Sequence, residues 1–115
     1  MKDRNVSIIE KILKYIREIE GTILRFQLDF EKFKDDYVAK NAISMSLLQI
    51  GELTGKLTDD FKMEHDVILW RDIAALRNRV AHAYGSIDIE ILWGIIENDI
   101  PKLKEYCERI TQGIK

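Results

Sequence analysis

The sequence is poor in residues that interrupt helices or cross-link chains. It contains one proline, six glycines and one cysteine in 115 residues. A single cysteine excludes an intramolecular disulfide, and so few turn formers argue against a sandwich or barrel of many short strands. No run of about 18 apolar residues occurs, and the charged N-terminal stretch resembles neither a signal peptide nor a membrane span. We therefore expect one all-α domain over residues 1–115, cytoplasmic and without a membrane partner.

An excess of positive charge is also absent. Lys and Arg number 18 against 20 Asp and Glu, which gives a net charge of −2. A strongly basic chain would indicate nucleic-acid binding by overall charge, so any RNA or nucleotide site here must be a local patch. The remaining composition, 46% apolar and 33% charged, is typical of a helical bundle.

Apolar residues recur at helical spacing in six segments, which predicts a compact antiparallel bundle of four to five helices. The segments are 5–20, a short one near 29–34, the longest at 36–57, then 67–84, 87–97 and a last one with Pro101 in its first turn. Gly21 is a plausible end of the first helix, although apolar residues continue beyond it. Asn98-Asp99 separates the last two, and Ser86 or Asp88 can cap the helix at 87–97.

Several single residues have a structural interpretation. The longest segment is apolar over a wide sector, as in a central helix, and we expect its Gly51 and Gly55 to let a neighbouring helix approach closely. Trp70 and Trp93 are interpreted as core or interface anchors. Cys107 lies on an apolar stripe and is expected to be buried. Residues 58–66 read as a polar loop, in which His65 is interpreted as an ordinary surface histidine.

The stretch RNRVAHAY, residues 77–84, concentrates cationic and aromatic side chains in an otherwise mildly acidic chain. At about 100° per residue, the core face of the helix at 67–84 comprises Leu69, Ile73, Leu76, Val80 and Ala83. Arg77 and Tyr84 stand in line at the edge of that face. A third line, roughly opposite the core, comprises Arg71, Asn78 and His82. Asn78 lies four residues before His82, within reach to orient its ring.

The residue types of this stretch suit phosphodiester cleavage without a metal. An imidazole titrates near neutrality, so His82 can transfer a proton during attack of a ribose 2′-OH on phosphorus. The guanidinium of Arg77 can grip the phosphate, and Arg79 and Arg71 can hold flanking phosphates. Tyr84 can stack on a base. No group of His, Cys, Asp and Glu has convincing metal-ligand spacing, so we expect neither metal nor cofactor.

The outer face of the same helix carries Ala74, Ala75 and Ala81 where a solvated face usually has Lys and Glu. We expect a partner there, most simply a second copy across a twofold axis. Arg77 and His82 lie about 140° apart around the helix, which also favours a dimeric site. The alternative from spacing alone is an ordinary helix with a solvated polar stripe.

These residues resemble those of a known family. Arg77, His82 and Tyr84 form R-x-x-x-x-H-x-Y, the signature of the HEPN superfamily, and Asn78 after the arginine matches its commoner form. Further elements of the HepT-like subgroup follow the order of the chain: Ile50-Gly51-Glu52 (IGE), His82 to Asp88 (HxYxxID), Leu92-Trp93 (LW) and Ile100 to Leu103 (IPxL). The resemblance covers nearly the whole chain.

The resemblance implies a function as well as a HEPN-like, homodimeric fold. Proteins similar to this one are toxins of type II toxin–antitoxin systems and metal-independent ribonucleases that cleave cellular RNA, including tRNA. Arg77 and His82 would be catalytic at the dimer interface. A cognate MntA-like nucleotidyltransferase antitoxin would transfer AMP to Tyr84 and silence the nuclease. The alternative is a non-catalytic nucleotide-binding or adaptor subunit for a nucleotidyltransferase.

Overall fold

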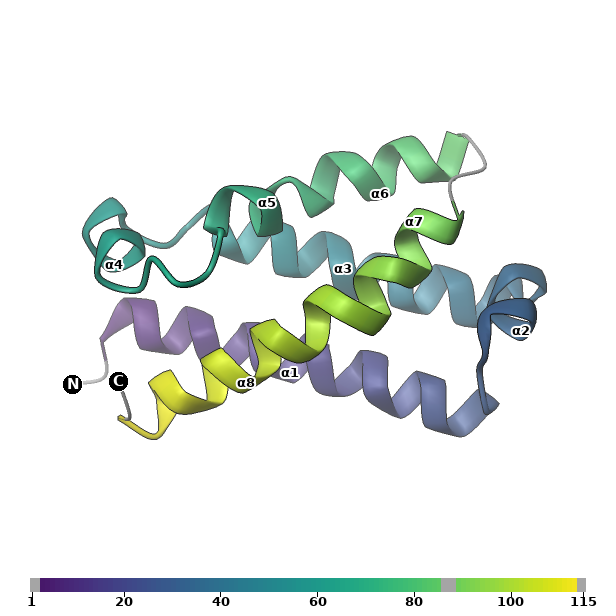
Figure 1. Cartoon of the computed structure of the whole chain (residues 1–115), viewed down its shortest axis with the longest axis horizontal. Coiled ribbons are helices and arrows are strands. Elements are labelled where there is room, and N and C mark those ends of the chain that lie inside the picture. Colours follow the sequence, from purple (N-terminus) through teal and green to yellow (C-terminus); the bar gives the residue numbers. More distant parts are fainter. Residues whose placement is uncertain (1–2, 86–88, 114–115) are drawn as a thin grey trace.

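The protein is an up-and-down bundle of helices, shown by a computed structural model that describes residues 3–85 and 89–113, without the side chains of 82–85 (Figure 1). No strand occurs in these described ranges. The elements are α1 (Arg4–Phe26), α2 (Phe30–Asp35), α3 (Tyr37–Thr54), α4 (Asp59–Glu64), α5 (Trp70–Ala74), α6 (Leu76–Gly85), α7 (Ile89–Gly94), the π-helical segment η1 (Ile95–Asp99) and α8 (Ile100–Thr111). The expected all-α bundle is confirmed.

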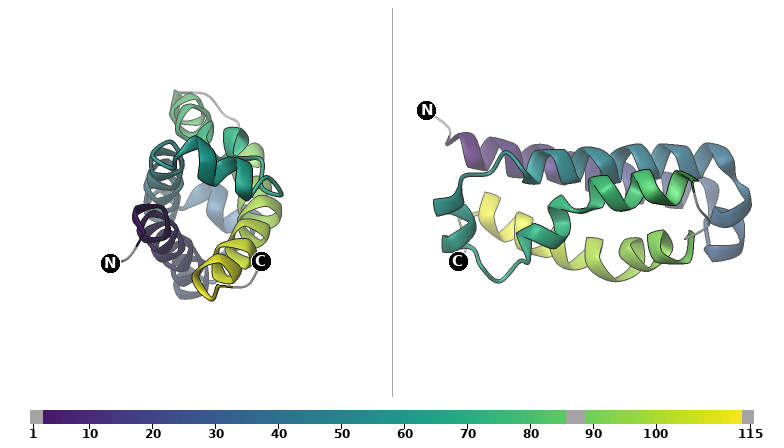
Figure 2. Two further views of the ribbon diagram at one scale, coloured as in Figure 1. Left: turned by 90° about the vertical axis from the view of Figure 1, so that its left-hand side faces the viewer. Right: turned by 90° about the horizontal axis from the view of Figure 1, so that it is seen from above.

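Four long helical segments surround one core. The end-on view in Figure 2 shows α1, α3, α6 and the rod formed by α7, η1 and α8 arranged around it. Helix α3 packs against both α1 and α6, and α1 also packs against α8. The fully buried side chains come from all four segments and include Ile9, Ile12, Ile16, Ile43, Leu47, Ile50, Leu76, Val80 and Leu103. Each such side chain contributes about 1.5–3 kcal/mol of burial free energy, so the apolar periodicity specifies the bundle.

Short polar side chains fix where several helices begin. Asp29 accepts a hydrogen bond from the amide of Lys32, and Asp36 accepts from two amides in the first turn of α3. The hydroxyl of Thr58 accepts from the amide of Phe61 at the start of α4. Because of this cap, residues 59–64 are helical, and the expectation of a loop over 58–66 is wrong there.

The first helix runs through Gly21, where no atom outside the helix lies within 4 Å of the position that a Cβ would take. It ends instead at Gln27, whose backbone is left-handed with φ 51°. The amide of Gln27 donates to the carbonyl of Leu24, and that of Leu28 donates to Ile23. Two of the last carbonyls of α1 are satisfied in this way, as in a Schellman-type end.

The helix expected at 67–84 is interrupted. Helix α5 begins only at Trp70, and a turn at Ala75 separates it from α6. The amide of Ala75 donates to the carbonyls of both Arg71 and Ile73, which tightens the turn. Leu69 precedes α5 and is 70% exposed, so its assignment to the core face is wrong. A helical projection does not apply to a residue outside the helix.

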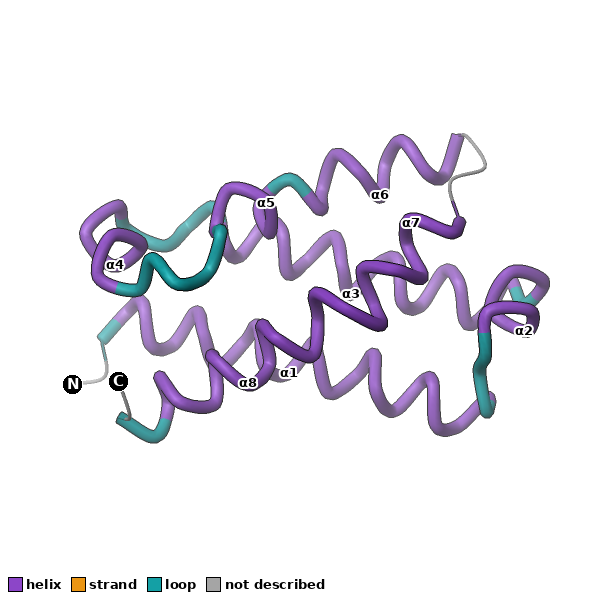
Figure 3. Tube along the Cα trace, in the orientation of Figure 1, coloured by secondary structure: helices purple, strands orange, loops and turns teal. Residues whose placement is uncertain are grey.

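The boundary expected at Asn98-Asp99 is confirmed, because η1 ends at Asp99 and α8 begins at Ile100. The helical path continues across this boundary without a loop. Figure 3 draws α7, η1 and α8 as one continuous helical rod. The amide of Ile100 donates to the carbonyl of Ile95, five residues back, and Pro101 follows in the first turn of α8. Pro101 has no amide hydrogen and cannot donate a helical hydrogen bond to a preceding carbonyl. The wider π turn directly before it is consistent with this missing hydrogen bond. No helix in the described ranges is both long and apolar enough to cross a membrane.

Candidate functional site

The first half of α6 is held rigidly on the bundle. Ile73, at the end of α5, and Leu76 and Val80, on α6, are all buried, which confirms these three members of the expected core face. Arg77 follows Leu76 directly and is turned outward, with 64% of its side chain exposed. A cation on a firmly packed helix is thereby presented to solvent.

Helix α3 approaches this part of α6 at backbone contact. A Cβ placed on Gly51 would lie 2.8 Å from the amide nitrogen of Arg77 and 3.2 Å from the carbonyl oxygen of Ala74. Only glycine allows this separation, so the expected close approach is confirmed at Gly51. It is wrong at Gly55, where, among the described residues, a Cβ would meet only the carbonyl oxygens of Glu52 and Gly51 in its own helix, at 3.4 and 3.9 Å.

The residue after Gly51 contacts the candidate catalytic arginine. Oε1 of Glu52 lies 2.6 Å from Nε of Arg77, and the Glu52 side chain is 35% exposed. From the sequence, Glu52 was notable only as the last residue of the Ile50-Gly51-Glu52 (IGE) element. The sequence signal available was an acid directly after a glycine on the central helix, but which neighbour it meets depends on how α3 and α6 pack.

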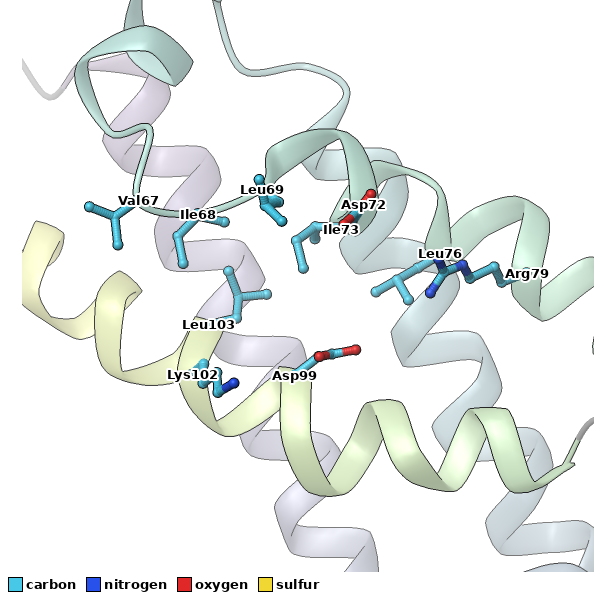
Figure 4. Close-up of a pocket in the computed structure, with 10 residues that line it drawn as sticks. All are labelled: Val67, Ile68, Leu69, Asp72, Ile73, Leu76, Arg79, Asp99, Lys102 and Leu103. Carbon is cyan, nitrogen blue, oxygen red and sulfur yellow. The ribbon is translucent and has the colours of Figure 1, made fainter.

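The other predicted site residues of this region lie at three different places. The uncharged Asn78 is exposed beside Arg77 on α6. Arg79 lines a cavity of about 310 Å³ formed by the segment before α5, the α5–α6 region and the η1–α8 junction (Figure 4). Arg71 is exposed on α5 and lines a second depression, toward α4. The two arginines therefore border two adjoining depressions, which share Ile68, Leu69 and Asp72, and neither is lined by Arg77.

Two of the predicted site residues are only partly covered by the structure. The backbones of His82 and Tyr84 belong to α6, but their side chains lie outside the described residues. The same holds for Ala83, and Ser86 and Asp88 lie outside altogether. Their predicted roles stay predictions.

The alanines of the outer face divide into two groups. Ala81 is exposed, as expected, whereas Ala74 and Ala75 are half-buried. The carbonyl of Ala74 faces Gly51 of α3. The turn at Ala75 interrupts the helix, so a single projection over α5 and α6 does not hold.

His65 is not an ordinary surface histidine. Its Nδ1 shares a hydrogen bond of 3.0 Å with the hydroxyl of Tyr106 on α8. Its ring lies 4.4 Å from that of Phe61, centroid to centroid, and its carbonyl accepts a 2.9 Å hydrogen bond from Nε1 of Trp70. The half-buried His65 therefore joins α4 and α8 through its ring and α5 through its carbonyl. Burial raises the pKa of Tyr106, so its hydroxyl stays protonated.

The lone thiol is unsuited to nucleophilic chemistry. Cys107 is fully buried in the core, as expected, and burial raises its pKa from its ordinary value of 9.0 to about 12. A thiol is the weak form of the nucleophile, since the thiolate is the reactive species. Trp70 is buried too, and Trp93 packs on Phe33 with ring centroids 5.1 Å apart, so both tryptophans serve the core.

Comparison with known proteins identifies similar sequences over nearly the whole chain. The family model described as "Ribonuclease HepT-like" matches residues 9–110. A protein named probable ribonuclease HepT, from Thermococcus cleftensis, is 34% identical over 112 residues, which cover 97% of this chain and 100% of that one.

Two further relatives carry similar names. A putative RNase from Caldanaerobacter subterraneus subsp. tengcongensis is 33% identical over 101 residues, with 87% of this chain and 90% of that one covered. A putative RNase from Methanocaldococcus jannaschii is 28% identical over 102 residues, with 87% and 94% covered. No solved structure is significantly similar to the chain.

Proposed function

The chain belongs to the ribonuclease HepT-like family, and from this premise we propose that it is a metal-independent endoribonuclease with Arg77 and His82 as its catalytic residues. The observation that carries the proposal is the presentation of Arg77. Its side chain is mostly exposed, while its backbone is fixed against Gly51 of α3. A preorganised cation of this kind can stabilise charge that develops on a phosphate.

The proposed reaction is transesterification within the RNA backbone. A ribose 2′-oxygen attacks the adjacent phosphorus, the bond from phosphorus to the 5′-oxygen breaks, and a 2′,3′-cyclic phosphate and a 5′-hydroxyl result. His82 transfers the proton that leaves the 2′-oxygen or reaches the 5′-oxygen. Arg77 stabilises the extra negative charge on the phosphoryl oxygens. Asn78, exposed on the same helix, orients substrate or the imidazole.

The proposed site is completed by a second copy of the chain. Arg77 and His82 project about 140° apart on one helix, so two copies facing each other through α6 bring both groups to one cleft more easily than one copy does. The exposed Ala81 leaves room for close approach of that second α6.

The proposed biological role is that of a toxin in a type II toxin–antitoxin pair. An MntA-like nucleotidyltransferase would transfer AMP from ATP to the hydroxyl of Tyr84, with release of pyrophosphate. Tyr84 lies seven residues from Arg77, two helical turns along nearly the same line, so an added nucleotide would place phosphate beside the guanidinium and occupy the substrate's anion site.

A cleavage assay tests the catalytic proposal. Purified protein is incubated with RNA in EDTA, and we expect cleavage that Arg77→Ala and His82→Ala each reduce by at least about 100-fold. Arg17→Ala is the matched control, because Arg17 is similarly exposed, 60%, and also has a carboxylate neighbour, Glu108 at 3.8 Å. Full activity in both the Arg77 and His82 variants would contradict the assignment. Nucleotide or nucleotidyltransferase binding without any cleavage would favour the adaptor alternative.

Mass spectrometry tests the modification. After coexpression with a cognate MntA-like nucleotidyltransferase, the intact mass should rise by one or more AMP units in the wild type and stay unchanged in Tyr84→Phe. Equal masses for the wild type and this variant, with an active partner present, would contradict the proposed switch.

A further inference from the structure

We propose that Glu52 is a positioning residue for Arg77: it binds the Nε side of the guanidinium and thereby turns the opposite, terminal edge toward the RNA phosphate. This inference rests on the proposed ribonuclease function. It assigns a role to a residue on α3, outside the motif on α6.

The geometry distinguishes the two edges of the guanidinium. A guanidinium offers one bidentate edge through Nε and a terminal nitrogen, and another through the two terminal nitrogens. Oε1 of Glu52 lies 2.6 Å from Nε of Arg77, so the contact occupies the first edge. The two terminal nitrogens remain available to grip a phosphate, and 64% of the arginine side chain is exposed to receive one.

The carboxylate itself is held in place by the packing of α3. Ile50 and Leu53, on either side of the Gly51–Glu52 step, are buried in the core, and Gly51 contacts the backbone of Arg77. Both ends of the Glu52–Arg77 pair therefore start from backbone positions that cannot slide relative to each other. A long, flexible arginine side chain then loses much of its rotamer freedom before substrate arrives, which is the usual gain from preorganisation.

Stability alone is a poor reason for the pair. Ion pairs with this much solvent exposure contribute little to stability, because water screens the two charges. The chain has another exposed pair of similar length, Glu20 with Lys104 at 2.9 Å, which joins α1 to α8 and includes no residue of α6. That pair is the matched control for a carboxylate that only stabilises the surface.

If Glu52 acted only through its negative charge, removing it would have the opposite effect on cleavage from the one that positioning predicts. A carboxylate beside a phosphate site repels RNA, so removing it would strengthen binding and leave cleavage equal or faster. Positioning predicts slower cleavage, because the cation loses its orientation. We expect Glu52→Ala to reduce kcat by about 10- to 100-fold with little change in KM. Glu52→Gln keeps an acceptor oxygen at the same place and should retain more activity than Glu52→Ala.

The test combines kinetics with a spectroscopic signature. Steady-state cleavage over a range of RNA concentrations gives kcat and KM for the wild type, Glu52→Ala, Glu52→Gln, Arg77→Ala, the double variant Glu52→Ala/Arg77→Ala and the control Glu20→Ala. Adding Glu52→Ala to Arg77→Ala should slow cleavage no further, since Glu52 acts only through Arg77. In ¹⁵N–¹H spectra, the Nε–H signal of Arg77 is assigned as the one that disappears in Arg77→Ala. In the wild type this signal should be shifted from the position of free arginine. In Glu52→Ala it should return to that position.

The experiment distinguishes failure of the positioning role of Glu52 from failure of the proposed ribonuclease function. Wild-type kcat in folded Glu52→Ala, or an equal further loss when Glu52→Ala is added to Arg77→Ala, would overturn the role of Glu52 while leaving the ribonuclease intact. An Nε–H signal that is the same in the wild type and Glu52→Ala would show that the contact does not form in solution, and would also overturn it. If the wild type cleaves no RNA, the proposed function fails, and the positioning role fails with it, whatever the spectra show.

Discussion

Gly51 and Arg77 bring the backbones of α3 and α6 so close that a single methyl group at Gly51 would lie 2.8 Å from the amide nitrogen of Arg77. The same contact sets the position from which the arginine side chain projects. The Gly51–Arg77 contact therefore determines both how α3 packs against α6 and where the Arg77 side chain begins.

Gly51→Ala should force the two helices apart. The new methyl group meets backbone atoms, which cannot move aside as a side chain can, so we expect a loss of about 1–3 kcal/mol in the free energy of unfolding and reduced RNA cleavage. Urea unfolding measures the first and the cleavage assay the second. Gly21→Ala is the control: Gly21 is exposed within α1 with nothing near a new methyl group, and the change should stabilise by up to about 1 kcal/mol. Equal stabilities for the two variants would contradict the packing.

Lysine should not replace arginine at position 77 in RNA cleavage, so Arg77→Lys should be as impaired as Arg77→Ala. A lysine ammonium is a point charge, so it cannot bind Glu52 through one edge and a phosphate through another. We expect activity close to that of Arg77→Ala, measured at equal RNA saturation. A lysine variant with near wild-type kcat would show that charge alone is sufficient.

Ala81→Arg should weaken the proposed dimer. Ala81 is exposed on α6, where a large cation would block the approach of a second α6. We expect a shift toward monomer in analytical ultracentrifugation, together with loss of cleavage. An active dimer that tolerates this change would place the interface elsewhere.

Tyr106→Phe should destabilise the junction of α4, α5 and α8. The hydroxyl is the partner of Nδ1 of the half-buried His65, and its loss leaves that nitrogen unpaired, at a cost of about 0.5–1.5 kcal/mol in the free energy of unfolding. Tyr15→Phe is the matched control, because Tyr15 also packs against the core and no hydrogen bond of its hydroxyl occurs among the described residues. Equal effects of the two changes would argue against the His65–Tyr106 bond.

Cys107 should make the fold sensitive to alkali. Its folded pKa of about 12 lies above the ordinary value of 9.0, so the folded state holds this proton more tightly than the unfolded state. Its contribution to stability is complete below pH 9 and is lost as the pH rises toward 12, by at most about 1.4 kcal/mol per pH unit. Cys107→Ala removes this component, so the pH dependence of urea unfolding above pH 9 should be weaker in the variant.

The individual helices were largely predictable because their periodicity reflects burial along one face. Ile9, Ile12 and Ile16 are spaced for burial from one helix and are buried. His65 was misjudged because its neighbours in the chain are polar, whereas its contacts, Phe61, Trp70 and Tyr106, reach it from α4, α5 and α8. Leu69 was misjudged because helical periodicity gives no sign of where a helix starts when no cap precedes it.

Local sequence determined that this chain forms helices, which of their faces are apolar, and that an arginine, a histidine and a tyrosine share one short helix. Those properties depend on residues within a few turns of each other, so spacing alone reveals them. Only tertiary packing decided that Glu52 meets Arg77 across two helices, that Arg79 borders a different depression from Arg71, and that a histidine joins three elements. The rotation and offset of one helix against another follow from the fit of many side chains at once, which no single segment of sequence contains.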